Sequence, residues 1–397
     1  MWADLCPVKG PDVSKLAPLI ARDPDEHHRA ATTLELFFDL VSVIAIAAVT
    51  VGLHHAIAEG HGIEALPRFV FLFLAIWWAW MNFTWFASAF DSDDTLYRLL
   101  VMVIMGGALI FAGGAGHIFQ TLDFSFGIVG WVVMRLGMIG LWLRAARVPG
   151  YRTTCLRYAA GIAVAQIAWC VMYFTTAPGS SLFYALGLIC FLIEFAVPPF
   201  AESARVTPWH RHHIIERYGL LMIISMGEIV LSISHGFGAL FSDHPSLHAA
   251  FVSVAALVIV FSIWWIYFCE EEHLPDARFW TAFTWGYGHV FLFMATAALG
   301  AAIAASIDVA TDHAHASQHE VSKWLGGSLA VGSLALWVTR DRVLALPARL
   351  NVALPVMALA FALAGVLGLP VWAFAVLSVA TAFWRAPGTR RDHPAAA

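Results

Sequence analysis

Apolar segments of about 20 residues, the length that crosses a bilayer as an α-helix, recur along almost the whole chain. The stretches between these segments are too short to form a soluble domain of useful size. The composition agrees, because 60% of the 397 residues are hydrophobic and only 12% are charged, whereas soluble domains have about 25% charged residues. The sequence therefore predicts an all-α fold, a polytopic bundle of transmembrane helices in the lipid bilayer.

The apolar segments predict about twelve helices, arranged as two halves of six. A tail (residues 1–30) precedes the first half (31–200), a linker (201–213) leads to the second half (214–385), and a second tail follows (386–397). The predicted helices cover residues 34–54, 68–90, 98–117, 125–144, 156–176, 181–200, 214–235, 247–269, 279–304, 323–339, 349–367 and 369–385.

The Lys and Arg residues are concentrated on one side of this arrangement. If the N-terminus lies inside the cell, 19 of the 22 Lys and Arg fall in cytoplasmic segments, and only Arg68 and Lys323 fall outside. Because short loops with positive charge stay in the cytoplasm, we predict that both termini are cytoplasmic and that the protein lies in the cell (plasma or inner) membrane. Residues 1–30 lack the features of a signal peptide, so we expect this tail to remain on the mature protein.

The two halves resemble each other at an offset of 181 residues. Glu35 then coincides with Glu216 and His54 with His235, on either side of equivalent apolar segments. The next helix of each half ends in aromatic residues, an acidic cluster and an Arg. Six helices per half give both halves the same orientation, so we predict a parallel 6+6 internal repeat about an axis along the membrane normal.

Carboxylates occur within the equivalent helices at the start of each half. Glu35 and Asp39 are four residues apart and share one helical face. Glu228 follows Glu216 by twelve residues, about 18 Å along the helix, which places it near the bilayer centre. A charge is costly in hydrocarbon, so such a group takes a proton or finds a cation. We interpret these four carboxylates as ionisable residues of a transport pathway, with an interfacial ion pair as the alternative for Glu35.

Arg135 is the only Lys or Arg deep inside a predicted helix, and it requires a carboxylate partner or a wet cavity. Glu194, Glu228 and Asp39 are the candidate partners. We interpret Arg135 and Glu194 as a gating or charge-compensating pair, with a structural ion pair that locks the bundle as the alternative. Further polar candidates are a cytoplasmic acidic and basic motif, Asp91, Asp94, Arg98 and Arg217, and the secondary positions Asn82, His54, His235 and His289.

Motifs for catalysis or cofactor binding are absent from the sequence. It has no Walker loop, nucleotide-binding glycine pattern, GxSxG elbow or HExxH, and its five cysteines show no CxxC spacing. The His-rich segment 308–320 lacks the spacing of a fixed metal site, and a metal-capturing loop is the alternative to a solvated linker. We therefore expect no enzyme activity, no cofactor and no metal and, without a dense basic patch, no nucleic-acid partner.

Three segments carry a family resemblance: "TTLELFFDLVSVIAIA", "FDSDDTLYRLLVMVIM" and "HIIERYGLLMIISMGE". They resemble the signature segments of the bacterial low temperature requirement A (LtrA) family. The resemblance implies an integral membrane protein of unsettled molecular activity. The family's motif positions, carried onto this chain, are Glu35, Phe38, Asp39, Asp91, Asp94, Arg98, His213, Glu216, Arg217, Gly219, Gly227 and Glu228.

These observations leave three functions open. The leading hypothesis is a secondary transporter of a small solute or cation, with proton coupling as an option, whose pathway lies between the two halves. The second is an ion channel, because Phe38 and Asp39 followed by "IAIA" are similar to the opening helix of a lysosomal potassium-channel family with six-helix repeats. The third is a structural or sensor protein in which the charges lock the bundle. The sequence does not distinguish a monomer from a homo-oligomer.

Overall fold

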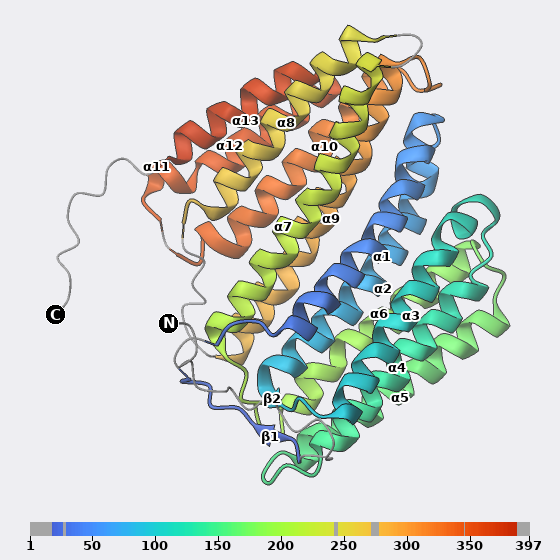
Figure 1. Cartoon of the computed structure of the whole chain (residues 1–397), viewed down its shortest axis with the longest axis vertical. Coiled ribbons are helices and arrows are strands. Elements are labelled where there is room, and N and C mark those ends of the chain that lie inside the picture. Colours follow the sequence, from blue (N-terminus) through green and yellow to red (C-terminus); the bar gives the residue numbers. More distant parts are fainter. Residues whose placement is uncertain (1–17, 27–28, 242–244, 271–277, 345, 387–397) are drawn as a thin grey trace, which may run out of the picture. The chain divides into compact units, whose positions relative to one another are not determined.

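The structure is a computed structural model that describes residues 18–26, 29–241, 245–270, 278–344 and 346–386 (Figure 1). Within these residues, eleven helices are long and apolar enough to cross a membrane, and the apolar helix Val371–Arg385 is shorter. The predicted all-α, polytopic membrane fold is therefore confirmed.

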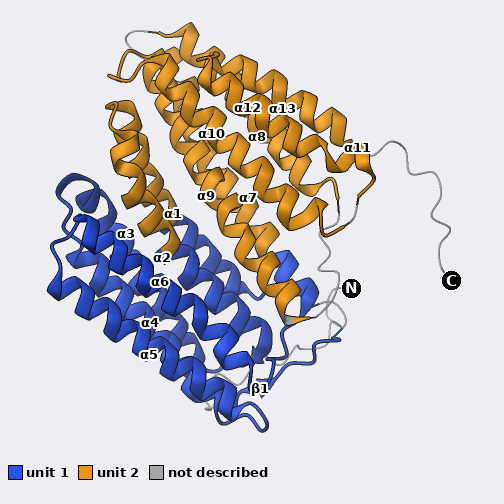
Figure 2. Cartoon of the chain, turned by 180° about the vertical axis from the view of Figure 1, so that it is seen from behind, with its two compact units in different colours: residues 1–45, 75–217 blue, residues 46–74, 218–397 orange. Residues whose placement is uncertain are grey.

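The chain divides into two compact units, shown in separate colours in Figure 2. Unit 1 comprises residues 1–45 and 75–217, and unit 2 comprises residues 46–74 and 218–397. The boundary between the units falls within three helices: α1 (Thr33–Ala58), α2 (Gly62–Ala89) and α7 (Arg211–Gly238). The units therefore differ from the predicted halves 31–200 and 214–385, and the 6+6 repeat stays a prediction.

Unit 1 combines parts of α1, α2 and α7 with four complete helices. A short antiparallel pair, β1 (Ile20–Ala21) and β2 (Phe90–Asp91), joins the segment before α1 to the end of α2, with Ile20 opposite Asp91. The complete helices are α3 (Thr95–Thr121), α4 (Ser125–Ala145), α5 (Arg152–Thr175) and α6 (Ser181–Glu202).

Glycine allows α3 and α4 to pack closely. A Cβ atom on Gly130 of α4 would lie 2.6 Å from the carbonyl oxygen of Gly107 in α3, well inside van der Waals contact. Small residues at such crossings let two backbones approach, which is a common source of helix association in membranes. Helix α4 also packs on α5, and α5 on α6, so these four helices form a consecutive series.

Unit 2 contains the remaining parts of α1, α2 and α7 and the second set of helices. Helix α10 packs against α9 and α12, and α8 packs against α13. The elements after α7 are the 3₁₀ turn η1 (Ala239–Phe241), α8 (Leu247–Phe268), α9 (Phe279–Ala310), α10 (Gln318–Leu336), the π-helical turn η2 (Trp337–Asp341), α11 (Ala348–Asn351), α12 (Ala353–Val366) and α13 (Val371–Arg385).

Each of the twelve predicted ranges falls on helical structure, and most differences lie at the ends. Helix α10 begins at Gln318, five residues before the predicted start, because Ser317 and Glu320 form a capping box. In this arrangement each side chain bonds the other residue's backbone N–H and so satisfies the first free donors of the helix. The predicted range 349–367 is occupied by α11 and α12, which meet at Val352.

Candidate functional site

Five ionisable residues of unit 1 form one buried cluster, called the charge network below. They are Arg29 before α1, Glu35 and Asp39 in the first turns of α1, and His213 and Arg217 in the first turns of α7. The most exposed, Arg29, has 6% of its surface accessible, and Asp39, His213 and Arg217 have none. Each helix contributes two residues four positions apart, which places both side chains on one face.

Asp39 is held by a two-point ion pair. Arg217 donates from Nε to Oδ2 at 2.9 Å and from Nη2 to Oδ1 at 2.6 Å. The indole Nε1 of Trp80, from α2, donates to Oδ1 at 2.6 Å. Paired charge-assisted hydrogen bonds of this kind are the strongest in proteins and fix direction as well as distance. The predicted pathway carboxylate Asp39 therefore accepts three hydrogen bonds, one at Oδ2 and two at Oδ1.

Glu35 has two roles: it caps the first turn of α1, and it belongs to the charge network. Its Oε2 accepts the backbone N–H of Thr32 at 2.6 Å, while Thr32 Oγ1 accepts the N–H of Glu35 at 3.3 Å. This is the reciprocal pattern of a capping box. Its Oε1 accepts a hydrogen bond from Arg29 Nη2 at 3.0 Å and lies 3.4 Å from Arg217 Nη1. Glu35 therefore has Arg partners, as its alternative interpretation requires, while its depth in the membrane stays a prediction.

Arg29 connects the segment before α1 to the end of α2. Its Nη2 donates to the carbonyl oxygen of Ala87 at 2.8 Å and its Nη1 to that of Ser88 at 3.1 Å. The last carbonyls of a helix have no partner within the helix. Arg29 therefore satisfies two such acceptors and presents the same guanidinium to Glu35.

His213 lies between a cation and a carboxylate. Its Nδ1 is 3.1 Å from Arg29 Nη1, and its Nε2 is 3.2 Å from Glu35 Oε1. Because a guanidinium has only donors, Nδ1 must accept, which leaves the ring proton on Nε2, facing Glu35. With this neutral tautomer, the two Arg and two carboxylates of the charge network balance in formal charge.

A second buried ion pair joins Arg135 of α4 to Glu194 of α6. Arg135 Nε lies 3.4 Å from Glu194 Oε1, without the geometry of a hydrogen bond. Trp78 Nε1 donates to Glu194 Oε2 at 2.9 Å, and the guanidinium carbon of Arg135 lies 3.9 Å from the centre of the Trp131 ring, a cation–π distance. Of the three carboxylates predicted as partners, Arg135 therefore meets Glu194.

The residues of the predicted acidic and basic motif that follow α2 form two separate pairs, whereas its member Arg217 lies in α7 and belongs to the charge network. Asp94 caps α3 by accepting the N–H of Tyr97 at 2.9 Å, and it also binds Arg144 Nη1 at 2.7 Å. Arg98 instead pairs with Asp93, at 2.7 Å, on the surface. Of Asp91, only the backbone belongs to the described part of the structure.

The remaining carboxylates of α7 lie outside the charge network. Glu216 is exposed and Glu228 is half-buried. Among the described residues, neither of them forms an ion pair. The position equivalent to the buried Glu35 in the proposed repeat is therefore a surface residue, so the two halves do not repeat this site.

The secondary polar positions have local partners or lie at the surface. Asn82 donates to Trp78 O at 2.8 Å and His289 Nδ1 lies 2.8 Å from Trp285 O. His54 pairs with Asp308 at 2.6 Å, both within unit 2, and His235 is exposed.

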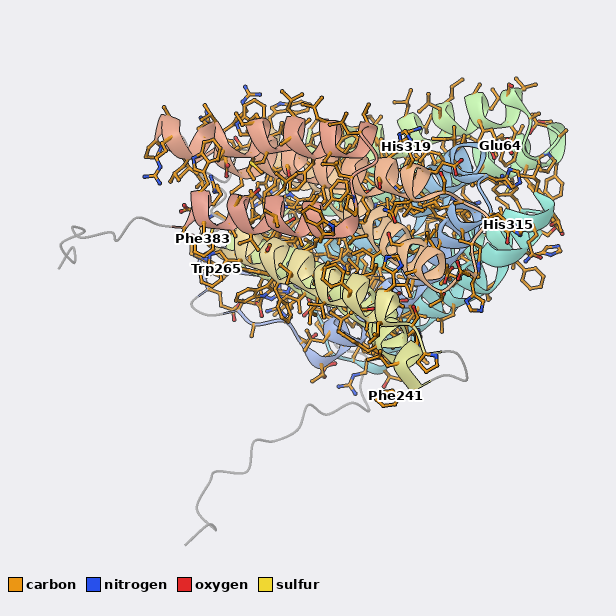
Figure 3. All side chains as sticks on the ribbon, turned by 90° about the horizontal axis from the view of Figure 1, so that it is seen from above. Glu64, Phe241, Trp265, His315, His319 and Phe383 are labelled. Atoms are coloured by element: carbon orange, nitrogen blue, oxygen red, sulfur yellow. The ribbon has the colours of Figure 1, made fainter. Side chains whose placement is uncertain are left out.

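The His-rich segment lies at the surface of unit 2. The backbone N–H groups of His315 and Ala316 both donate to Ala58 O at 2.8 Å, so the segment is attached to the C-terminal end of α1. The side chain of His315 is 81% exposed and 3.6 Å from Glu59 (Figure 3). Within the described ranges, no three His, Cys, Asp or Glu side chains are placed to hold a metal ion.

Sequence reasoning missed three functional contacts: the indole donors of Trp78 and Trp80, and Arg144 as the partner of Asp94. A Trp inside an apolar helix still carries an N–H that needs an acceptor. That requirement could have indicated the contacts of Trp78 and Trp80 with buried carboxylates. The pairing of Arg144 with Asp94 joins residues 50 positions apart, which no local pattern shows.

Comparison with known proteins places the chain in a family. The model of the bacterial low temperature requirement A protein (LtrA) matches residues 30–386, nearly the whole chain. An uncharacterised protein of Rhizobium meliloti (strain 1021) is 25% identical over 274 residues, and the matched region spans 64% of this chain and 64% of that protein. No solved structure matches. The chain therefore belongs to the bacterial low temperature requirement A (LtrA) family.

Proposed function

We propose that this membrane protein is a secondary transporter of a small solute, and that the charge network changes its pairing during the transport cycle. The observation that carries the proposal is the burial of five ionisable side chains where α1, α2 and α7 of unit 1 meet. Well-packed apolar residues often stabilise a protein as well as a buried ion pair does. Ionisable groups inside a membrane protein therefore point first to ion or substrate handling.

The contacts of Arg217 offer a way for pairing to change. Its guanidinium binds Asp39 through Nε and Nη2, while Nη1 lies 3.4 Å from Glu35. Protonation of Asp39 would remove the two-point attraction and leave Glu35 as the remaining anion. A proton would thus favour one arrangement of α1 and α7 over another, and differential binding of this kind is what couples a ligand to a conformational equilibrium.

The orientation of the chain is part of the proposal. The uneven distribution of Lys and Arg supports cytoplasmic termini, and Arg29 lies in the N-terminal tail with Glu35 a few residues after it. The charge network would then lie near the cytoplasmic end of α1 and α7, where it would respond to the pH inside the cell.

A structural lock is the second candidate, and one observation favours it: each carboxylate of the charge network already has an Arg partner. In this account the charges only hold the helices together. Removing a charge would lower the yield of folded protein, and there would be no flux to lose.

Proton and solute fluxes in proteoliposomes test the proposal. Vesicles that contain a pH-sensitive dye are exposed to a panel of small solutes, first with the parent and then with Asp39→Asn, which keeps the side chain's size and removes its charge. We expect solute-dependent proton movement in the parent and its loss in folded Asp39→Asn. Asp93→Asn, which removes a surface pair with Arg98, is the matched control.

Three outcomes would reject the proposal. Asp39→Asn could transport as the parent does, or the parent could move no member of the panel. Planar-bilayer recordings could also show unitary currents far above transporter turnover, which would favour the channel.

A further inference from the structure

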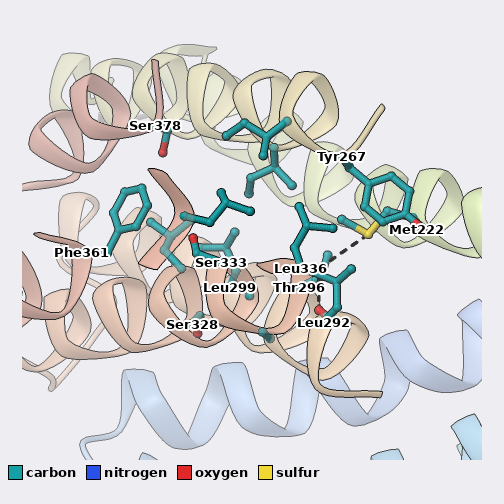
Figure 4. A pocket seen from close by; sticks show the side chains of 16 residues that line it. Met222, Tyr267, Leu292, Thr296, Leu299, Ser328, Ser333, Leu336, Phe361 and Ser378 are labelled. Carbon is teal, nitrogen blue, oxygen red and sulfur yellow. Dashed lines mark hydrogen bonds between the residues drawn. The ribbon is translucent and has the colours of Figure 1, made fainter. Parts of the chain in front are cut away.

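A cavity lies within unit 2, among α7, α8, α9, α10, α12 and α13 (Figure 4). Its volume is about 50 Å³, and sixteen residues line it. Most of these are apolar, such as Leu292, Leu336 and Phe361, and none of the sixteen is charged. The polar groups are hydroxyls, those of Ser328 and Ser333 on α10, Thr296 on α9 and Ser378 on α13, together with Tyr267 on α8.

The hydroxyl of Ser378 is the unusual feature of this cavity. The residue is 1% exposed, and its Oγ has no hydrogen-bond partner in the described structure. Figure 4 shows this oxygen directed from α13 toward Phe361 and Ser333. A buried hydroxyl without a partner is unfavourable, so the site lacks one hydrogen-bonding group.

Other buried hydroxyls in unit 2 show that a local solution was available. Thr381, one turn further along α13, donates to Leu377 O at 2.7 Å, and Ser306 of α9 donates to Ala302 O at 2.8 Å. Back-bonding of this kind is the usual arrangement for Ser and Thr inside a helix. Ser378 does not adopt it, and its hydroxyl faces the cavity instead.

We propose that this cavity binds a small neutral solute that has an apolar body and one hydrogen-bonding group, as a short alcohol or amide has. The absence of charged groups from the lining argues against an ion, because a buried charge without a partner is costly. Because one water needs about 10–15 Å³, a volume of 50 Å³ holds about three to five water-sized groups. That is too little for a lipid acyl chain, and the apolar walls would leave waters with few partners.

This inference names the solute class of the proposed transporter, and it rests on the proposed function for the solute's movement across the membrane. Binding itself needs no gradient. Met222, which lines the cavity, and Arg217 of the charge network both belong to α7, so one helix carries residues of both sites.

Equilibrium binding of n-butanol tests the inference. The full chain is placed in lipid nanodiscs, empty nanodiscs give the background from partition into lipid, and saturation-transfer NMR measures the bound probe. Butyrate and n-butylammonium are charged probes of similar size. We expect butanol to bind the parent and the charged probes not to bind.

Three variants locate the probe. Ser378→Ala removes the hydroxyl and should weaken butanol binding about five-fold, the effect of one neutral hydrogen bond. Ser306→Ala makes the same change at a buried hydroxyl that already has its acceptor, and it should bind as the parent does. Ala295→Phe fills the cavity and should abolish binding. If Ala295→Phe does not fold, Ser333→Leu is used in its place, with the same expected result.

The inference fails if the parent gives no more signal than empty nanodiscs, if Ser378→Ala binds as tightly as Ser306→Ala, or if n-butylammonium binds as well as butanol. These results are independent of transport. Loss of coupling in Asp39→Asn with butanol binding intact supports both proposals. Parent-like coupling in Asp39→Asn with butanol binding intact rejects only the role of the charge network.

Discussion

At the scale of single residues, we expect the ion pair between Asp39 and Arg217 to matter most for the stability of the fold. Neither side chain is accessible to solvent, and the pair has two hydrogen bonds below 3 Å. Two buried charges lower each other's free energy only while both are present. Removing one partner and removing both should therefore have very different effects.

Arg217→Leu should lower the free energy of unfolding by about 3–5 kcal/mol, because it leaves Asp39 as a buried charge with Trp80 as its one remaining donor among the described residues. Asp39→Leu with Arg217→Leu should recover most of this loss. Unfolding in mild detergent, followed by circular dichroism, measures both variants. Equal destabilisation by the single and double changes would show that the pair is not the source of the effect.

Glu194→Gln should also destabilise the protein, since it leaves Arg135 charged in the middle of α4 with Trp131 as its main remaining contact. Adding Arg135→Met should restore stability. The comparison variant is Asp93→Asn. It removes an exposed pair with Arg98, and this loss should leave the unfolding midpoint unchanged. A midpoint in Glu194→Gln as high as in Asp93→Asn would contradict the predicted role of this carboxylate.

At the scale of helices, capping and close approach decide where elements begin and how they pack. The capping boxes Thr32 with Glu35 and Ser317 with Glu320 start α1 and α10. Arg29 binds the last carbonyls of α2, and in unit 2 Arg340 binds those of α8, at 2.6 Å for Ile266 O and 2.9 Å for Tyr267 O. Similar helix ends in the two units are thus satisfied by arginines from different parts of the chain.

Gly130→Ala should weaken the packing of α3 on α4, because the new Cβ would lie 2.6 Å from Gly107 O. Gly113→Ala in α3 is the matched control. Nothing lies within 4 Å of its Cβ position, so the higher helix propensity of Ala should make it neutral or slightly stabilising. Thermal unfolding compares the two, and a Gly130→Ala midpoint at or above that of Gly113→Ala would be inconsistent with this packing.

The helices could be predicted from the sequence, whereas most pairings within the candidate site could not. Long apolar segments locate helices because any spanning segment must satisfy its backbone internally. The capping boxes join residues three positions apart, a local signal that the predicted start of α10 at residue 323 did not use. Asp39 and Arg217 are 178 residues apart, and nothing local to either residue specifies the other. Glu35 and Glu216 look equivalent in the sequence, yet one is buried and the other exposed.

At the scale of the whole molecule, the membrane topology remains a prediction from the Lys and Arg distribution. A variant without native cysteines should accept a membrane-impermeant maleimide at Asp123→Cys, in the turn between α3 and α4, on intact cells. Arg147→Cys, between α4 and α5, should react only after the membrane is permeabilised. The opposite pattern would reverse the orientation and place the charge network at the outer end of α1.

Transport by the variant that lacks the central ion pair, Asp39→Leu with Arg217→Leu, is the most direct measurement of what this pair in the charge network does. The variant retains an apolar, packed contact between α1 and α7, so its unfolding midpoint should stay near that of the parent. In proteoliposomes we expect it to lose solute-dependent proton flux. A folded variant that transports and couples as the parent does would show that this ion pair only holds the helices together.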